Sequence, residues 1–284
     1  MATDGTYYGR GPRRLGVRLL PLLLAGLAAA FIAFKGCQEG PFGRQQIVAL
    51  NPQQEQQLGL EAYQEVLGKS DVVRDGPAVT TVKRVTGRLV GAVRNPEFLR
   101  AVGLKEPPDY SWDVRLVRSE QVNAFCLPGG KMVVYTAILP VCQMDAGLAT
   151  VMGHEIAHAL AQHGAERMAQ TQMVNIGMTA AGGALGNMDP NDRAKIMAVL
   201  NAGAKFGILK YSRSHESEAD HVGLLLMAAA GYDPRESVKF WERMRKMAGG
   251  GKTPEFLSTH PSEETRIKQI EGWLPEALQH YKPR

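Results

Sequence analysis

The stretch that most constrains this chain is "VMGHEIAHALAQHGAERM", residues 151–168, which carries His154, Glu155 and His158. At about 100° per residue, the two histidines lie about 40° apart on one face of a helix, so both imidazoles can reach one metal ion. Glu155 stands beside them, where it can hold a water molecule at that ion. The spacing H-E-x-x-H therefore predicts a zinc-binding helix, and the alternative is a helix with structural histidines.

His163 is expected to lie outside this metal group. It follows His154 by nine residues, which is about 180° around a helix, so its side chain would be solvated near the helix end. The longer metal-binding pattern H-E-x-x-H-x-x-G-x-x-H would need glycine at 161 and histidine at 164, where this chain has Ala161 and Gly164. A third ligand must therefore come from another segment.

The segment "YSRSHESEAD", residues 211–220, offers the candidate third ligand. Glu216 and Asp220 are four residues apart and share one face of a predicted helix. Glu216 would bind the zinc, and Asp220 would accept a hydrogen bond from a ligand histidine. Glu218 lies about 200° from Glu216 and would point away. The alternative is a solvated acidic helix face.

The chain opens with a basic and then an apolar segment. Most of the net charge of +5 lies in residues 1–36, which contain one acidic residue, Asp4, and five basic residues, Arg10, Arg13, Arg14, Arg18 and Lys35. Leu19–Phe34 carries no charge and approaches the roughly 20 apolar residues of a spanning helix. We expect an uncleaved membrane anchor. The alternatives are a signal peptide cleaved near Ala28-Ala29-Ala30 and a lipid anchor on Cys37. In each case the domain that follows would lie outside the cytoplasm, in the periplasm.

Charge and cysteine content narrow the classes of function. The positive charge precedes an apolar run and forms no patch on a folded part, so we predict no nucleic-acid partner. Cys37, Cys126 and Cys142 lack C-x-x-C spacing, which excludes a cysteine zinc site. We expect three buried thiols, although Cys126 and Cys142 could pair in an oxidising compartment.

The rest of the chain is predicted to be mostly helical. Helices are expected over about 52–68, 77–93, 145–171, 191–208, 213–230, 233–247 and 262–273. Residues 112–117 predict a strand, and "NAFCLPGGKMVVYT" predicts a hairpin around Pro128-Gly129-Gly130. The Gly-rich residues 177–190 could be a mobile lid or a connecting loop. We divide the chain into the N-terminal segment 1–36, a linker over 37–50 and one domain over 51–284.

The motif HEIAH followed by "ESEAD" at 216–220 resembles the gluzincin metallopeptidases, the family of the CAAX prenyl endopeptidase, HtpX and BepA. The likeness covers most of residues 50–275, including "NAFCLPGGKMVVYT" and "STHPSEETRI". The single apolar segment, with no tetratricopeptide repeats, is similar to a single-anchor, periplasmic branch. The resemblance implies an α+β, mostly helical zincin-like metalloprotease domain, with a small sheet or hairpin beside the H-E-x-x-H helix and one Zn²⁺ per chain.

The resemblance also implies roles for three residues. Glu216 would be the third zinc ligand, and Asp220 would be the supporting carboxylate. His260, in "STHPSEETRI", matches a histidine that can approach the zinc as a plug over a latent site. His260 could instead cap the backbone before Pro261.

We therefore predict a zinc metalloendopeptidase that hydrolyses unfolded or misassembled envelope proteins in quality control or processing. Glu155 would take a proton from water and pass it to the leaving amine. His215 and Arg213 are candidates for stabilising the transition state. A substrate strand is expected to pair with a sheet edge formed by Asn123, Lys131, Met132, Val133 and Val134. The alternative is a latent, zinc-stabilised and membrane-tethered chaperone or assembly factor. Polypeptides are the expected partners, and the sequence indicates no particular oligomeric state.

Overall fold

The computed structural model of the chain describes residues 15–185, 189–249, 254–260 and 264–283. The helices are α1 (Leu15–Gly36), α2 (Pro52–Gly68), α3 (Pro77–Val93), α4 (Pro96–Val102), α5 (Leu139–Cys142), α6 (Asp145–Leu160), α7 (His163–Ala184), α8 (Pro190–Ala229), α9 (Glu236–Ala248), α10 (Glu255–Thr259) and α11 (Glu264–His280), with 3-10 turns η1 (Pro41–Gly43) and η2 (Thr136–Ile138). The strands are β1 (Cys37–Glu39), β2 (Gln45–Ile47), β3 (Val72–Val73), β4 (Asp113–Val117), β5 (Ala124–Leu127) and β6 (Lys131–Tyr135). The predicted α+β, mostly helical class is confirmed.

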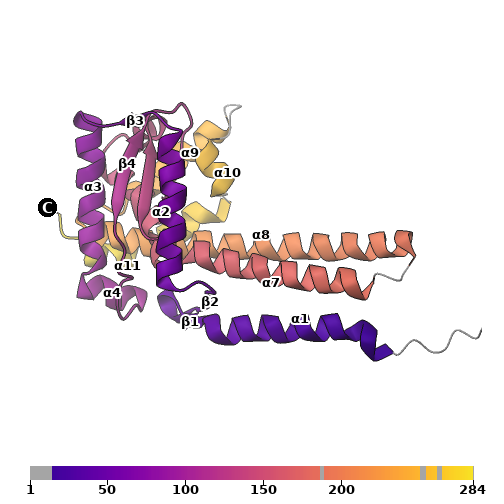
Figure 1. The fold of residues 1–284 in the computed structure, drawn as a ribbon. Coiled ribbons are helices and arrows are strands. Elements are labelled where there is room, and N and C mark those ends of the chain that lie inside the picture. Colours follow the sequence, from indigo (N-terminus) through magenta and orange to yellow (C-terminus); the bar gives the residue numbers. More distant parts are fainter. Residues whose placement is uncertain (1–14, 186–188, 250–253, 261–263, 284) are drawn as a thin grey trace, which may run out of the picture.

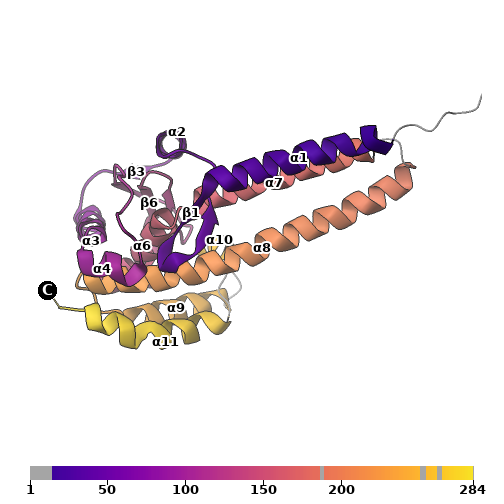
Figure 2. The same ribbon diagram turned by 90° about the horizontal axis from the view of Figure 1, so that it is seen from below.

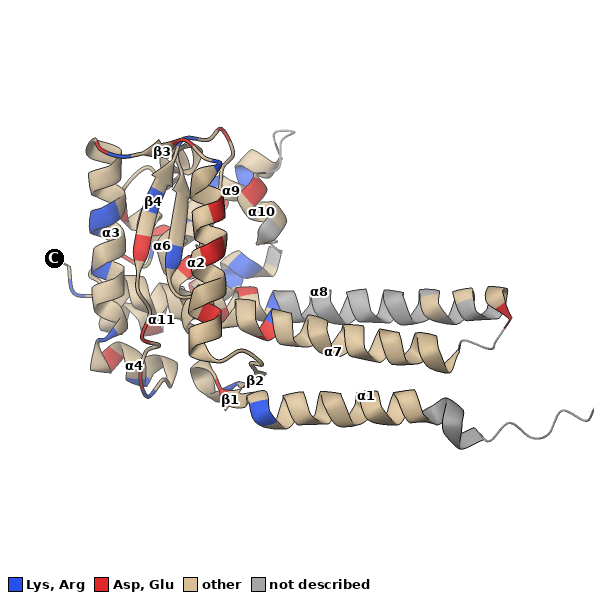
Figure 3. Ribbon diagram, in the orientation of Figure 1, with Lys and Arg blue, Asp and Glu red and all other residues tan. Residues whose placement is uncertain are grey.

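The elements form a body and a long projection. The body holds the larger sheet among helices, whereas α1, α7 and α8 extend away from it (Figure 1). A second view shows α1 running along α7, with α8 on the other side of the projection (Figure 2). Charged residues lie mostly on the body, and the described parts of α1 and α7 carry few of them (Figure 3).

The larger sheet has the strand order β3-β4-β6-β5. Strand β6 pairs in parallel with β4 and antiparallel with β5, and the turn between β5 and β6 uses Gly129 and Gly130 at positive φ. The predicted hairpin and the strand near 112–117 are therefore confirmed. However, the prediction that Lys131–Val134 lie at the sheet edge is wrong. They lie inside the sheet because β4 covers the other side of β6, and the edge strand is β5.

Helix α6 lies at the centre of the body and is buried from Gly147 to Leu160. It packs on α8 at Gly153 and Gly223. A Cβ built on Gly223 would lie 2.9 Å from the backbone nitrogen of His154, and one on Gly153 would lie 3.0 Å from the Gly223 carbonyl oxygen. Glycine permits this approach because it has no Cβ. The two helices therefore come close enough for carboxylates of α8 to reach histidines of α6.

The helix predicted over 145–171 is interrupted. Helix α6 ends at Leu160, Gln162 adopts a left-handed φ of 51°, and α7 begins at His163. A residue at positive φ cannot continue a right-handed helix. The side chains of α7 therefore do not follow the 100° rotation counted from His154, so the prediction for His163 has no geometric basis.

Two other segments also differ from the predictions. Residues 191–208 and 213–230 were predicted as separate helices, but both belong to α8. The Gly-rich residues from 177 to 184 continue α7 and form neither a lid nor a loop. Residues 186–188, and the predicted start of the last helix at Ser262, lie outside the described residues.

The N-terminal part contains more structure than the expected linker. Within residues 37–50, β1 and β2 form an antiparallel hairpin that pairs Cys37 with Ile47. Apolar side chains of α1 are exposed, among them Leu23, Leu27 and Phe34. Across the described part of the chain, no helix combines the length and the apolar character required to cross a membrane.

The three cysteines are free thiols in this structure. Cys142 is buried and Cys126 is half-buried, but Cys37 is exposed, so the prediction of three buried thiols is wrong for Cys37. Burial raises the pKa of the Cys142 thiol to about 12 and also raises the pKa of Cys126. These two thiols are therefore protonated at neutral pH.

Candidate metal centre

Four potential metal donors converge between α6, α8 and the segment after α10. His154, His158, Glu216 and His260 each offer a ligand atom, and these atoms lie within 4.8 Å of one another. Nε2 of His154 is 3.1 Å from Nε2 of His158 and 3.2 Å from Nδ1 of His260. Both Glu216 carboxylate oxygens lie 3.1 Å from the same His260 atom.

This donor set fits zinc. Tetrahedral zinc binds nitrogen and carboxylate oxygen at about 2.0–2.1 Å, so its ligand atoms lie about 3.3 Å apart. The donor-atom pairs that include His154 or Glu216 are separated by 3.1–3.4 Å. Three imidazoles and one carboxylate are also ligands that zinc prefers. The predicted metal group is therefore present, and His260 belongs to it.

The donors differ in how firmly they hold protons. Burial lowers the pKa of His158 to about 3, so its ring is neutral. Burial would also lower the pKa of His154, but hydrogen bonds to Asp220 and Glu216 raise it to about 9. A histidine ligand must be neutral, so a dication would take the place of that proton beside the two carboxylates.

Glu155 lies next to the donors. One carboxylate oxygen, Oε2, accepts a hydrogen bond from the backbone N–H of Cys126 at 3.1 Å. The other, Oε1, lies 3.3 Å from Nε2 of His260 and has no hydrogen-bond partner among the described residues. Burial raises the pKa of this carboxyl group. Glu155 therefore has a free acceptor atom pointing to the metal group, as expected of a residue that handles protons there.

Asp220 and Arg266 support His154 from behind. Oδ1 of Asp220 lies 2.9 Å from Nδ1 of His154, as predicted for the supporting carboxylate. The guanidinium of Arg266, on α11, donates to both oxygens of Asp220 at 2.6 and 2.8 Å and stacks 3.5 Å from the centre of the Trp241 ring. Sequence reasoning missed Arg266, although it falls within the quoted "STHPSEETRI".

His163 is buried and contacts the metal group, contrary to prediction. Its side chain is fully covered, and its Nδ1 lies 2.8 Å from Nδ1 of His158. Its Nε2 lies 2.7 Å from Oε2 of Glu218. Glu218 does point away from Glu216, but its side chain contacts His163 and is buried. Burial raises the pKa of Glu218 to about 7.

The two proposed transition-state stabilisers are absent from the lining of the cleft at the metal group. His215 is buried, its Nε2 is 3.0 Å from Glu166, and its ring stacks on that of His163 at 4.1 Å. Arg213 is exposed and lines a small surface pocket beside Arg266. Neither residue lines the cleft at Glu155 and His158.

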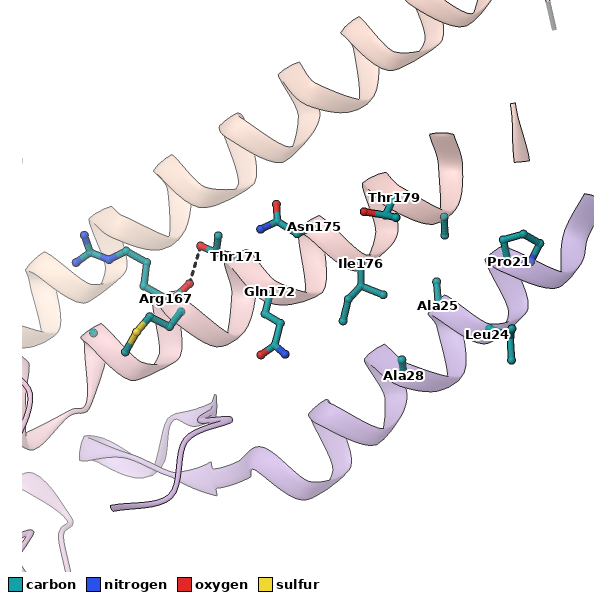
Figure 4. Close-up of a pocket in the computed structure, with 13 residues that line it drawn as sticks. Pro21, Leu24, Ala25, Ala28, Arg167, Thr171, Gln172, Asn175, Ile176 and Thr179 are labelled. Atoms are coloured by element: carbon teal, nitrogen blue, oxygen red, sulfur yellow. Dashed lines mark hydrogen bonds between the residues drawn. The ribbon is translucent and has the colours of Figure 1, made fainter. Parts of the chain in front are cut away.

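Two cavities meet at the start of α7. The cleft at the metal group is lined by Glu155, His158, His260 and the edge-strand residues Phe125 and Cys126. A groove of about 880 Å³ lies along α1 and α7 (Figure 4). Gly164 and Arg167 line both cavities, so the groove continues the cleft along the projection.

Comparison with known proteins identifies the family. The model of Peptidase family M48 matches residues 92–274, which is more than half of the chain. The chain belongs to Peptidase family M48. This confirms the predicted gluzincin family, and a zinc metallopeptidase domain with it. The matched residues include the whole of α6 and all four metal donors.

Several curated relatives carry peptidase names. The chain is 37% identical over 227 residues to the "Mitochondrial metalloendopeptidase OMA1" of Schizosaccharomyces pombe, covering 78% of this chain and 62% of that protein. It is 30% identical to the human "Metalloendopeptidase OMA1, mitochondrial", covering 89% of this chain and 49% of the relative. The "Beta-barrel assembly-enhancing protease" of Escherichia coli O157:H7 is 28% identical, with 75% and 42% covered. The chain thus spans less than two thirds of each of these relatives.

The relatives correct the predicted location. We expected a catalytic domain anchored on the periplasmic side or secreted to the periplasm. The relative from Schizosaccharomyces pombe, and two others from Saccharomyces cerevisiae and Arabidopsis thaliana that are 38% and 41% identical, are named as mitochondrial metalloendopeptidases. The periplasmic prediction is therefore wrong: an N-terminal basic and apolar segment does not by itself distinguish export from other kinds of targeting.

Proposed function

We propose that this chain is a zinc-dependent endopeptidase that cleaves unfolded or misassembled polypeptides. The observation that carries the proposal is the buried convergence of His154, His158 and Glu216 next to the free acceptor atom of Glu155. These three residues would hold the metal, and His260 lies at the fourth donor position. Bound zinc supplies a Lewis acid that polarises a carbonyl group and lowers the pKa of water.

Glu155 is proposed as the general base. Its Oε1 has no described hydrogen-bond partner, and its Oε2 is held by the Cys126 N–H, so the carboxylate is oriented. It would accept a proton from the attacking water and deliver that proton to the nitrogen of the leaving amine. Asp220 and Arg266 would keep the His154 ring in place during these proton transfers.

The substrate is proposed to pair with β5, and not with β6. The N–H of Cys126 points from β5 to Glu155 and not to β6, so this edge of the sheet faces the reacting groups. Asn123, just before β5, has a buried side-chain oxygen without a described hydrogen-bond partner. An extended peptide could add to this edge through main-chain hydrogen bonds, which favours unfolded segments over particular side chains.

The groove along α1 and α7 supports a polymeric substrate. It continues from the cleft and combines apolar residues such as Ile176 with polar ones such as Gln172 and Asn175 (Figure 4). A polypeptide has both apolar side chains and main-chain groups that need hydrogen bonds. Such a lining suits a chain that extends beyond the scissile bond.

A latent assembly factor is the second candidate function, favoured by the position of His260 at the fourth donor site. The two candidates are separated by hydrolysis of casein by the full chain, with and without zinc chelator. A protease should cleave casein, and both chelator and the Glu155→Gln variant should abolish cleavage. Absence of hydrolysis by the zinc-loaded wild-type chain, and also by a His260→Ala variant, would refute the endopeptidase proposal.

A further inference from the structure

The two metal-binding histidines of α6 are supported differently. His154 contacts a carboxylate directly through Nδ1, at 2.9 Å from Asp220. His158 instead places Nδ1 at 2.8 Å from Nδ1 of a second histidine, His163. Metal-binding histidines usually donate their other ring N–H to a carboxylate, a carbonyl or water. The support of His158 therefore requires its own explanation.

The hydrogen bonds define which nitrogen carries each proton. If His158 binds metal through Nε2, its proton lies on Nδ1 and is donated to His163. His163 must then accept at Nδ1, so its own proton lies on Nε2 and is donated to Oε2 of Glu218 at 2.7 Å. The same oxygen accepts a hydrogen bond from Nε of Arg44 at 2.8 Å. The hydrogen bonds thus form one consistent chain, in which His158 donates to His163 and both His163 and Arg44 donate to Glu218.

Arg44 is bound firmly at the other end. Its two terminal nitrogens donate to the two carboxylate oxygens of Glu166 at 3.1 and 2.9 Å. Glu166 also accepts from Nε2 of His215, whose ring stacks on His163. His163, Glu166 and His215 are at most 2% exposed. Arg44, Glu166, His215 and Glu218 thus form a connected cluster of contacts around the ring of His163.

Its members come from separate parts of the chain. Arg44 lies between η1 and β2, His163 and Glu166 open α7, and His215 and Glu218 lie on α8. Arg44 also lies outside residues 92–274, which match the family model. The side chain of Arg44 therefore connects the β1–β2 hairpin that follows α1 to the metal group.

We propose that His163, Glu218 and Arg44 form a positioning relay that fixes the tautomer and orientation of His158, and that Arg44 thereby sets the metal affinity from the N-terminal hairpin. The relay is the counterpart of His154–Asp220–Arg266, with one histidine inserted between ligand and carboxylate. This inference rests on the proposed metal site but does not require hydrolysis. None of the three relay residues lines the cleft at Glu155 and His158.

Metal affinity tests the relay. Zinc dissociation constants would be measured by chelator competition for the wild-type chain, His163→Phe and Arg44→Gln. Phenylalanine keeps the ring but removes the acceptor, so we expect affinity to fall about 10- to 100-fold, the usual effect of losing such support. Arg118→Gln is the matched control, because Arg118 forms an exposed ion pair with Asp71 far from the cluster, and its affinity should be unchanged.

Nitrogen NMR of the wild-type zinc protein gives a second test that needs no variant. The relay predicts a proton on Nδ1 of His158 and on Nε2 of His163. A proton on Nδ1 of His163, or affinity within twofold of wild type in folded His163→Phe, would overturn the relay. Failure of the wild-type chain to bind zinc at all would instead overturn the proposed metal site. The two failures are therefore distinguishable.

Discussion

Replacing His260 by alanine tests whether the metal centre is held closed. Nδ1 of His260 lies 3.2 Å from His154 and 3.1 Å from both oxygens of Glu216, and its Nε2 lies 3.3 Å from Glu155. The imidazole thus occupies the place where water and a substrate carbonyl would enter, and it covers the proposed base. We expect His260→Ala to raise proteolysis while zinc stays bound to the remaining three ligands.

The structure sets the size of the increase. A hydrogen bond to a charged group contributes about 1.5–3 kcal/mol; Nδ1 of His260 makes such a contact with Glu216 before zinc binds, and we take the same magnitude for the contact that holds His260 at the zinc. Since 1.4 kcal/mol is about a factor of ten in an equilibrium, removing this contact should raise the open fraction about 10- to 150-fold.

The assay is casein hydrolysis normalised to bound zinc, with the melting temperature measured in parallel. His280→Ala is the matched histidine control, because His280 ends α11 away from the metal group. His260 also packs on Phe256 at a ring distance of 4.7 Å, so a purely structural histidine would act through stability. A lowered melting temperature with unchanged hydrolysis per zinc would refute the latch and leave His260 as a packing residue.

Three further outcomes are expected. His158→Ala should lose most of the one zinc per chain found in the wild type by elemental analysis, and undiminished zinc would contradict its role as a ligand. Glu155→Gln should keep zinc and fold but lower hydrolysis about 10²- to 10⁴-fold; activity within tenfold of wild type would exclude a general base at this position. Arg266→Met should lower the free energy of unfolding by about 3–5 kcal/mol in urea titration, because Asp220 would be left buried without its cation. A loss below 1 kcal/mol would show that Asp220 does not need it.

Local periodicity was enough to predict which residues share a face within each of the two helices of the metal group. His154 and His158 share a face of α6, and Glu216 and Asp220 share a face of α8, because residues four apart in a helix always do. The close packing of these helices was not predictable from either helix alone. It depends on Gly153 and Gly223 meeting across the interface, which a single sequence does not reveal.

One error comes from a local change in backbone conformation, and the others depend on contacts between segments that are distant in the sequence. His163 was misplaced because a single left-handed residue, Gln162, ends one helix and starts another. The edge strand was misassigned because the parallel pairing of β4 with β6 joins segments that are not hairpin neighbours. Arg44 and Arg266 were missed because an arginine in the sequence carries no local sign of the carboxylate it will meet.

The two arginines are expected to fail in different ways when replaced. Arg266 is 4% exposed and is the guanidinium bound to Asp220, so its loss leaves a buried charge and should reduce the stability of the whole domain. The side chain of Arg44 is 24% exposed, and its partner Glu166 keeps a hydrogen bond from His215 when Arg44 is removed. Its replacement should therefore cost less stability and act mainly on the order of the His163 ring. If Arg44→Gln lowered stability as much as Arg266→Met while leaving zinc affinity intact, the N-terminal hairpin would be a structural clamp and not part of the support of His158.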